Sequence, residues 1–119
     1  MTKIEINKIV ESLIKTFLNA GKISLELRKK GLTKSIKSDN TPVTNGDLEV
    51  NKIITKKITE STPTIPIISE ETSDNKSLKD LKNFWLIDPI DGTYDYINNL
   101  DEFTINAGLI INKKPAAGL

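Results

Sequence analysis

Two carboxylates, Asp88 and Asp91, lie three residues apart on either side of Pro89, directly after the apolar run 84–87. Pro89 has no backbone N–H and keeps the residue before it extended, so we expect a strand that stops with the Asp88 carboxylate facing out of its end. Two neighbouring anions repel each other unless a cation lies between them. The pair is therefore a candidate cation site. An Asp-Pro turn followed by an Asp-Gly turn is the alternative, and it needs no ligand.

The next two residues add a candidate anion site. Gly92 allows the backbone to approach a ligand closely because it has no side chain. If a short helix follows over residues 94–97, the amides of Gly92 and Thr93 would point at an anionic oxygen. The segment then has the chemistry of a combined metal and phosphate site.

A further carboxylate, Glu70, follows Ser69 at the end of a second apolar run, residues 65–68. If the two apolar runs form neighbouring strands, Glu70 lies beside Asp88 and three carboxylates converge. An exposed charged loop is the alternative for Glu70 and Glu71 taken alone. The chain contains no His and no Cys, and hard oxygen ligands without imidazole or thiolate select Mg²⁺ or a similar ion. We therefore expect Mg²⁺ or a similar ion as the cofactor.

The composition excludes several other classes of function. The 119 residues suffice for one domain, and the absence of Cys and His removes disulfides, thiolate nucleophiles and imidazole bases. Residues 1–60 carry 12 Lys and Arg against 7 Asp and Glu, whereas residues 61–119 carry 5 against 9. The basic half lacks interleaved aromatic residues, so we interpret it as a solvated helix face and exclude a nucleic-acid polymer as partner. No apolar run approaches the roughly 20 residues of a transmembrane segment, and no secretory signal is recognisable, so we expect a cytoplasmic protein.

Two helices are expected before the carboxylates. Apolar and small residues at helical spacing predict a long amphipathic helix that ends near Gly31. Its expected buried stripe consists of Ile6, Ile9, Val10, Leu13, Ile14, Phe17, Ala20, Ile23, Ser24 and Leu27. Thr44 and Asp47 form a capping-box pattern, with Asp in place of Glu, that predicts the start of a second helix. That helix should end near Pro63, because proline cannot continue it.

The remaining pattern predicts a sheet. Strands are expected over residues 65–68, 84–87 and 103–111, and a further strand would begin at residue 116. Residues 72–82 predict a surface loop with a helical turn at residues 78–81. The expected fold is α+β, with two amino-terminal helices packed on a mainly antiparallel sheet.

Four ordered motifs resemble those of one family, the magnesium-dependent, lithium-sensitive phosphatases that include inositol monophosphatase and the 3′(2′),5′-bisphosphate nucleotidases of the CysQ type. The motifs are Asp-Asn-Thr-Pro-Val-Thr at 39–44, Pro-Ile-Ile-Ser-Glu-Glu at 66–71, Trp-Leu-Ile-Asp-Pro-Ile-Asp-Gly-Thr at 85–93 and Glu-Phe-Thr-Ile-Asn at 102–106. The amino-acid sequences of these motifs are closer to those of the CysQ branch. The resemblance implies a layered sugar-phosphatase-like fold and a small-molecule phosphomonoester substrate, with hydrolysis of adenosine 3′,5′-bisphosphate to AMP and phosphate by the complete form.

The resemblance also implies roles for individual residues. The implied Mg²⁺ ligands are Glu70, Asp88, the carbonyl of Ile90 and Asp91, with Asp88 bridging two ions. The implied surroundings of the substrate phosphate are Glu70, Ile90, Asp91, Gly92 and Thr93. Asp47 and Thr93 would form the water-activating pair, and this role is compatible with Asp47 also capping a helix. Lys37 matches a basic position of the family, but as one lysine among many it is given no role.

Two departures from the family pattern affect these expectations. Residues 94–96 read Tyr-Asp-Tyr where CysQ-like proteins carry Lys-Glu before an aromatic residue, so a cation near the phosphate is missing. Family members are also longer, and the resemblance places another metal-ligating Asp in the absent part. We therefore expect residues 1–119 to be a truncated amino-terminal portion of a phosphatase domain, weakly active or inactive alone. The alternatives are a noncatalytic fragment, a subunit that pairs with a separately encoded carboxyl-terminal half, and an inositol or sugar monophosphatase.

Overall fold

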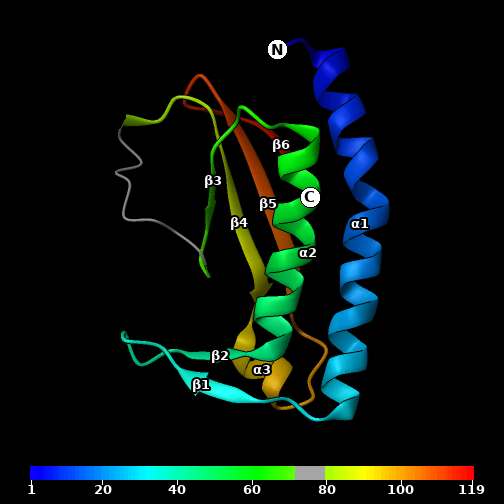
Figure 1. Cartoon of the computed structure of the whole chain (residues 1–119), viewed down its shortest axis with the longest axis vertical. Coiled ribbons are helices and arrows are strands. Elements are labelled where there is room, and N and C mark those ends of the chain that lie inside the picture. The colour runs from blue at the N-terminus through cyan, green and yellow to red at the C-terminus, as the bar shows by residue number, and fades with distance from the viewer. Residues whose placement is uncertain (72–79) are drawn as a thin grey trace.

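The computed structural model describes residues 1–71 and 80–119, in which two long helices lie against one face of a sheet (Figure 1). The elements in chain order are α1 (Lys3–Lys30), β1 (Lys34–Ile36), β2 (Pro42–Thr44), α2 (Asn45–Ser61), β3 (Ile67–Ser69), β4 (Phe84–Asp91), α3 (Thr93–Ile97), β5 (Thr104–Ile111) and β6 (Lys114–Gly118). Most of the loop predicted over residues 72–82, and half of its helical turn, fall outside the described residues.

Each long helix begins at a capping box. At α1, the Thr2 hydroxyl accepts a hydrogen bond from the Glu5 amide at 3.1 Å, and the Glu5 carboxylate accepts one from the Thr2 amide at 3.3 Å. Thr44 and Asp47 make the equivalent pair at α2, at 3.2 and 2.9 Å. The predicted start of the second helix is confirmed, and so is the end of the first before Gly31. In the described part of the chain, no helix is both long and apolar enough to cross a membrane.

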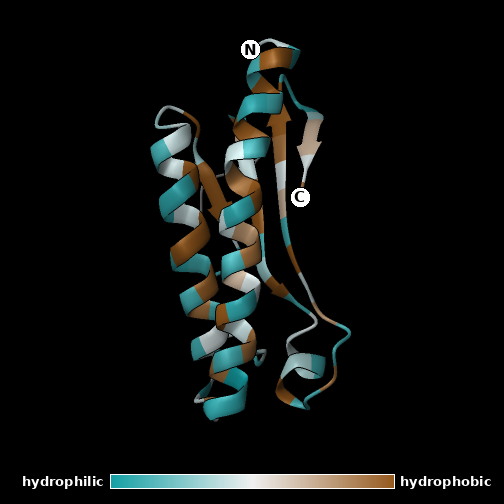
Figure 2. Cartoon of the chain, turned by 90° about the vertical axis from the view of Figure 1, so that its right-hand side faces the viewer, coloured by the Kyte–Doolittle hydropathy of each residue, from teal (hydrophilic) through white to brown (hydrophobic). Residues whose placement is uncertain are grey.

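The main sheet has the strand order β3-β4-β5-β6. β3 runs parallel to β4, whereas the β4–β5 and β5–β6 pairs are antiparallel, so the expectation of a mainly antiparallel sheet is confirmed. Figure 2 shows α1 and α2 together in front of the strands, on one side of the sheet. The sequence did not predict the small hairpin of β1 and β2, which pairs residues 34–36 with residues 42–44 around the expected turn.

The core lies between the helices and the sheet. Leu13 of α1, Ile54 of α2 and Trp85 of β4 are fully buried in one cluster, and burying each such side chain contributes on the order of 1.5–3 kcal/mol. The Trp85 indole N–H donates to the Thr62 hydroxyl at 3.1 Å, so the buried ring leaves no polar atom unpaired. The predicted burial of Ile14 is wrong, because this side chain is 48% exposed. It lies beyond the edge of the stripe that packs on α2.

The predicted end of the second strand at Asp88 is also wrong. β4 continues past Pro89 to Asp91, which pairs with Thr104 of β5. The ladder register shifts between Asp88 and Asp91, and this irregularity accommodates a proline that has no N–H to donate. The irregularity falls at the two carboxylates, Asp88 and Asp91.

Candidate active site

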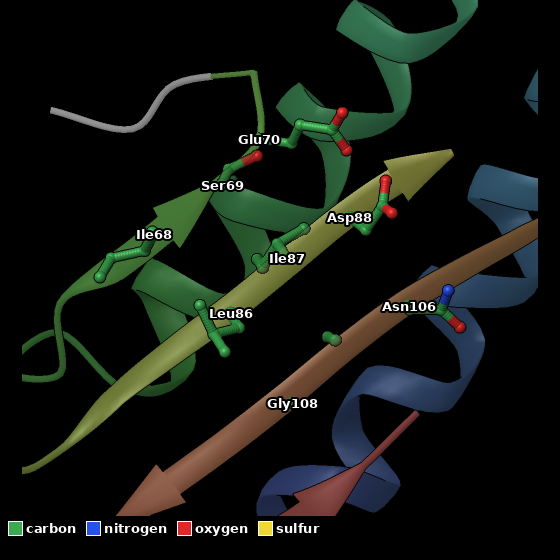
Figure 3. A pocket seen from close by; sticks show the side chains of 9 residues that line it. Ile68, Ser69, Glu70, Leu86, Ile87, Asp88, Asn106 and Gly108 are labelled. Carbon is green, nitrogen blue, oxygen red and sulfur yellow. The ribbon is translucent and has the colours of Figure 1, made fainter. Parts of the chain in front are cut away.

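The parallel pairing of β3 and β4 places Glu70 beside Asp88. The Glu70 amide donates to the carbonyl of Ile87 at 3.1 Å, extending the β3–β4 ladder by one residue beyond Ser69. Figure 3 shows the Glu70 and Asp88 side chains extending from the two neighbouring strands into the same space. The juxtaposition predicted from the strand ends is therefore present.

The residues proposed from the sequence as metal ligands and as surroundings of the phosphate line one open pocket of about 210 Å³. Its walls are Glu70 after β3, the β4 residues Asp88, Ile90 and Asp91, then Gly92, Thr93 and Tyr94, with Thr41 and Pro42 of the hairpin. Among residues 1–71 and 80–119, no three Asp or Glu side chains form a group that could hold a metal ion. The carboxylates share a pocket without forming a closed cage.

The Asp88 carboxyl has one oxygen atom that no hydrogen bond satisfies. Its Oδ1 atom is buried and has no hydrogen-bond partner. Burial of this carboxyl, together with the neighbouring carboxylates of Glu70, Asp91 and Glu71, raises its pKa to about 7. A divalent cation would satisfy the orphaned oxygen and screen the repulsion among these carboxylates. The donor set, all oxygen, is the one that suits Mg²⁺.

Asp47 and Thr93 meet at one side of the pocket. The Thr93 hydroxyl donates to Asp47 Oδ1 at 3.0 Å and lies 3.3 Å from the Ile90 carbonyl oxygen. Asp47 is 1% exposed, and its Oδ2 accepts hydrogen bonds from the amide and the hydroxyl of Thr44 at 2.9 and 2.5 Å. One carboxylate oxygen of Asp47 thus caps α2, while the other holds Thr93. The capping and the pairing predicted for Asp47 coexist.

Glycines occupy two crowded positions, one at the start of α3 and one in the first turn of α2. Gly92 has a φ of 91°, a left-handed conformation that other residues rarely adopt, and a Cβ there would lie 2.9 Å from the carbonyl oxygen of Glu102. At Gly46 a Cβ would lie 2.3 Å from the hydroxyl oxygen of Tyr96. That hydroxyl donates to the carbonyl of Ser24 at 2.6 Å, and burial raises the pKa of Tyr96 to about 12. Tyr96 therefore ties α3 to α1 through this hydrogen bond and packs closely on Gly46 in the first turn of α2.

Lys37 is a site residue to which the sequence analysis gave no role. From the β1–β2 turn its ammonium reaches Glu71 at 3.4 Å and Glu70 at 3.6 Å. Partial burial opposes the charged form, but the carboxylates of Glu71 and Glu70 outweigh it and raise the pKa of Lys37. The resemblance of residues 37–44 to the family's first loop was the one signal that pointed to it.

A second hollow lies on the sheet face opposite the helices. It encloses about 560 Å³ between β3, β4 and β5, and Ile68, Leu86 and Gly108 form part of its wall. Glu70 and Asp88 line this hollow as well as the smaller pocket. The carboxylates therefore lie where the apolar face of the sheet meets the polar pocket.

Comparisons with known proteins identify the fold and the family of this chain. The inositol monophosphatase family profile matches residues 5–119. A 3′(2′),5′-bisphosphate nucleotidase CysQ of Haemophilus influenzae is 39% identical over 98 residues, which make up 81% of this chain and 36% of that protein. Among solved structures, the suhB protein of Bartonella henselae superposes with a TM-score of 0.81 at 21% identity, covering 93% of this chain and 43% of that one. An IMPase/NADP phosphatase complexed with Mg²⁺ and phosphate gives a TM-score of 0.76 at 22% identity, covering 97% and 42%.

This chain spans less than half the length of each of these proteins. Within that span, the likeness includes the segments that contain Glu70, Asp88 and Thr93, because the family profile covers nearly every described residue. The fold neighbours confirm the predicted layered α+β architecture. The chain belongs to the inositol monophosphatase family.

Proposed function

We propose that this chain provides the metal-binding and water-activating part of a Mg²⁺-dependent phosphomonoesterase. The observation that carries the proposal is the buried Oδ1 of Asp88, which has no hydrogen-bond partner and lines the same pocket as Glu70 and Asp91. A protein rarely leaves such an oxygen unpaired unless a ligand or ion satisfies it. Membership of a family with phosphatase relatives supports this interpretation.

In the proposed site, Glu70, Asp88, the carbonyl of Ile90 and Asp91 hold Mg²⁺. When bound, Mg²⁺ would act as a Lewis acid that lowers the pKa of water and neutralises phosphate charge. Gly92 and Thr93 offer backbone amides to the phosphate at the same end of the pocket. The carboxylates themselves repel a phosphate, so these residues bind an anion only together with the cation.

The chain's own proton chemistry lies in Thr93 and Asp47. Because Thr44 occupies Oδ2 of Asp47, only Oδ1 is left to accept from the Thr93 hydroxyl. That donation orients the lone pairs of the Thr93 oxygen towards the pocket, where they can accept a proton from water. Asp47 then takes the hydroxyl proton of Thr93. This relay needs no histidine, in keeping with a sequence that has none.

Binding of Mg²⁺ tests the proposal without any activity measurement. A ligand that binds only the folded state at about ten times its Kd stabilises that state by roughly 1.4 kcal/mol, which raises the Tm of a domain of this size by several degrees. We expect this rise for the unchanged chain and its loss in Asp88→Asn. Glu60→Gln, which neutralises an exposed carboxylate at the end of α2, should behave like the unchanged chain. No Mg²⁺-dependent rise, or an equal rise in Asp88→Asn, would refute the metal site.

For the substrate, we propose a 3′(2′),5′-bisphosphate nucleotide. Support comes from the 39% identity to a CysQ nucleotidase and from the residues of the four sequence motifs, which resemble those of the CysQ branch. The Tyr-Asp-Tyr sequence of residues 94–96 is the feature that argues for another phosphomonoester, such as an inositol or sugar phosphate. The part of the relatives that this chain does not cover would complete the pocket, and it can be supplied by a separately encoded partner.

Phosphate release distinguishes these alternatives. Residues 1–119 are assayed with Mg²⁺ on adenosine 3′,5′-bisphosphate and on inositol 1-phosphate, alone and mixed with a complementing carboxyl-terminal chain. We expect little turnover alone, because the pocket is open and does not position the organic part of a substrate. With the complement, the nucleotide should be hydrolysed faster, and Asp88→Asn should abolish the reaction. Equal or reversed rates would assign the chain to the sugar-phosphatase branch.

A further inference from the structure

The short helix α3 carries two tyrosines on opposite sides. Tyr94 and Tyr96 are two positions apart, which turns their side chains about 200° from each other around a helix axis. Tyr96 is fully buried and donates to the Ser24 carbonyl at 2.6 Å. Tyr94 is 66% exposed and forms part of the wall of the carboxylate pocket. Tyr96 therefore holds α3 in the fold, while Tyr94 presents an accessible aromatic ring at the pocket.

The carboxylate pocket is too small to enclose a whole nucleotide. Its volume is about 210 Å³, whereas pockets that bury a drug-sized ligand measure about 300–1,000 Å³. A phosphate bound through a cation would occupy the space beside Glu70 and Asp88, so the organic part of the ester must lie at the rim. α3 lies beside β2, and residues of both elements line the pocket (Figure 1). Among the described residues of this wall, Tyr94 is the only aromatic one.

The charges around the pocket limit what can bind beside Tyr94. The carboxylates of the pocket wall belong to Glu70, Asp88 and Asp91. Asp95 follows Tyr94 in the sequence, and the described wall contains no lysine or arginine. Lys37, which approaches the pocket from the hairpin, is paired with Glu71 at 3.4 Å. These carboxylates repel a second phosphate but not an uncharged planar ring, so a neutral aromatic group is the ligand that suits this rim.

We propose that Tyr94 recognises the base of a nucleotide substrate by stacking its ring on the base. This inference rests on the proposed Mg²⁺-dependent binding of phosphate, and it names the contact that selects among phosphomonoesters. Aromatic side chains stack on nucleobases of any kind because every base has a π-face. An inositol or sugar ring has none, so Tyr94 favours a nucleotide. The ring takes the place of the lysine that CysQ-like proteins carry after the threonine of this motif.

The hollow on the sheet face is the alternative position for a base. It is larger, at about 560 Å³, and it shares Glu70 and Asp88 with the pocket. Its described wall contains aliphatic side chains such as Leu86 but no aromatic ring. A base bound there would contact Leu86 and leave Tyr94 uninvolved. Substitutions at Tyr94 and Leu86 therefore distinguish the two positions.

Binding of four phosphates in excess Mg²⁺, followed by NMR chemical-shift titration, tests the inference. The ligands are inorganic phosphate, inositol 1-phosphate, adenosine 3′-monophosphate and adenosine 3′,5′-bisphosphate. Tyr94→Leu keeps an apolar side chain but removes the ring, so it should raise the Kd of both adenosine ligands at least about fivefold. It should leave the Kd of the other two ligands unchanged. The adenine protons should shift upfield on binding to the unchanged chain and to Tyr94→Phe, but not on binding to Tyr94→Leu.

Leu86→Ala, at a 41% exposed leucine in the hollow, is the control and should change none of the four Kd values. Three results would overturn the stacking while phosphate binding stands. These are adenosine ligands unaffected by Tyr94→Leu, adenosine ligands weakened by Leu86→Ala instead, and inositol 1-phosphate weakened by Tyr94→Leu as much as the adenosine ligands. If inorganic phosphate shows no Mg²⁺-dependent binding to the unchanged chain, the proposed phosphate site is refuted and the stacking with it.

Discussion

The Thr93 hydroxyl donates to Oδ1 of Asp47 across 3.0 Å and so joins the first turn of α3 to the first turn of α2. The two residues are 46 positions apart in the sequence. Because Asp47 is buried and its other oxygen is held by Thr44, this hydrogen bond fixes the direction in which the Thr93 oxygen faces the pocket. The cap of α2 and the proposed catalytic base are thus one carboxylate.

Removal of the Thr93 hydroxyl tests this arrangement. Thr93→Val keeps the shape of the side chain but leaves Asp47 Oδ1 without its donor, so the free energy of unfolding should fall by about 1–3 kcal/mol. Urea unfolding measures the loss, and Thr93→Ser should retain most of the stability because it keeps the hydroxyl. Equal stability of Thr93→Val and the unchanged chain would mean that the hydrogen bond contributes nothing in solution.

Substitution by alanine should have opposite effects on stability at two helical glycines, because one is crowded and the other is not. Gly46→Ala places a methyl group 2.3 Å from the Tyr96 hydroxyl oxygen, and the resulting displacement should cost about 1–3 kcal/mol. Gly21→Ala, in the middle of α1, meets no atom nearer than Ile105 Cδ1 at 4.0 Å. It should stabilise the chain by up to about 1 kcal/mol through helix propensity. Chemical denaturation of both variants checks the signs, and a stabilising Gly46→Ala would contradict the close packing of Tyr96 on Gly46.

The raised pKa of Asp88 predicts that the stability of the metal-free chain depends on pH. Its pKa is raised from 3.8 to about 7, so the folded state holds this proton more tightly than the unfolded chain does. The resulting contribution to stability is complete below about pH 4 and is lost as the pH rises through 7. In buffer with EDTA, the unchanged chain should therefore lose more stability between about pH 5.5 and 8 than Asp88→Asn does. Parallel pH profiles for the two chains would show that Asp88 is not responsible.

Lys37 should affect stability and metal affinity in opposite directions. Its ammonium contacts Glu71, whose side chain is only 5% exposed, so Lys37→Met should lower the metal-free stability by about 1–3 kcal/mol. The same substitution removes a positive charge that would compete with a cation for Glu70, and it should lower the Kd for Mg²⁺ several-fold. Calorimetric titration with Mg²⁺ measures the affinity. Lys34→Met, at an exposed lysine on β1, serves as the control and should change neither quantity.

Local signals in the sequence predicted the elements that carry the site. The Thr44 and Asp47 pattern located the start of α2 because a capping box forms within one turn of chain. The apolar runs located β3 and β4 because buried strands have few polar residues, and the carboxylates at their ends identified the candidate site. Nothing in these patterns gave the direction of pairing. The proposed proximity of Glu70 and Asp88 required neighbouring strands, and the structure makes them parallel neighbours.

The features that sequence reasoning missed depend on contacts between distant segments. The β1–β2 hairpin has three-residue strands, which are too short for a period-two pattern to be recognised. Lys37 faces Glu71 only because this hairpin folds towards β3. Ile14 fits the helical pattern of the buried stripe, but the width of that stripe depends on how α2 packs on α1. The extension of β4 past Pro89 depends on a bulge that its partner strand accommodates.

The pocket draws its walls from Thr41, Glu70, Asp88 and Thr93, whereas α1 and α2 pack on each other within residues 3–61. A nascent chain leaving the ribosome can therefore form the helical pair from local contacts before β4 has been synthesised. β4 must then pair with β3 before Glu70 and Asp88 come together. The like charges of Glu70 and Asp88 thus meet only after the segments that form the helical pair have been synthesised.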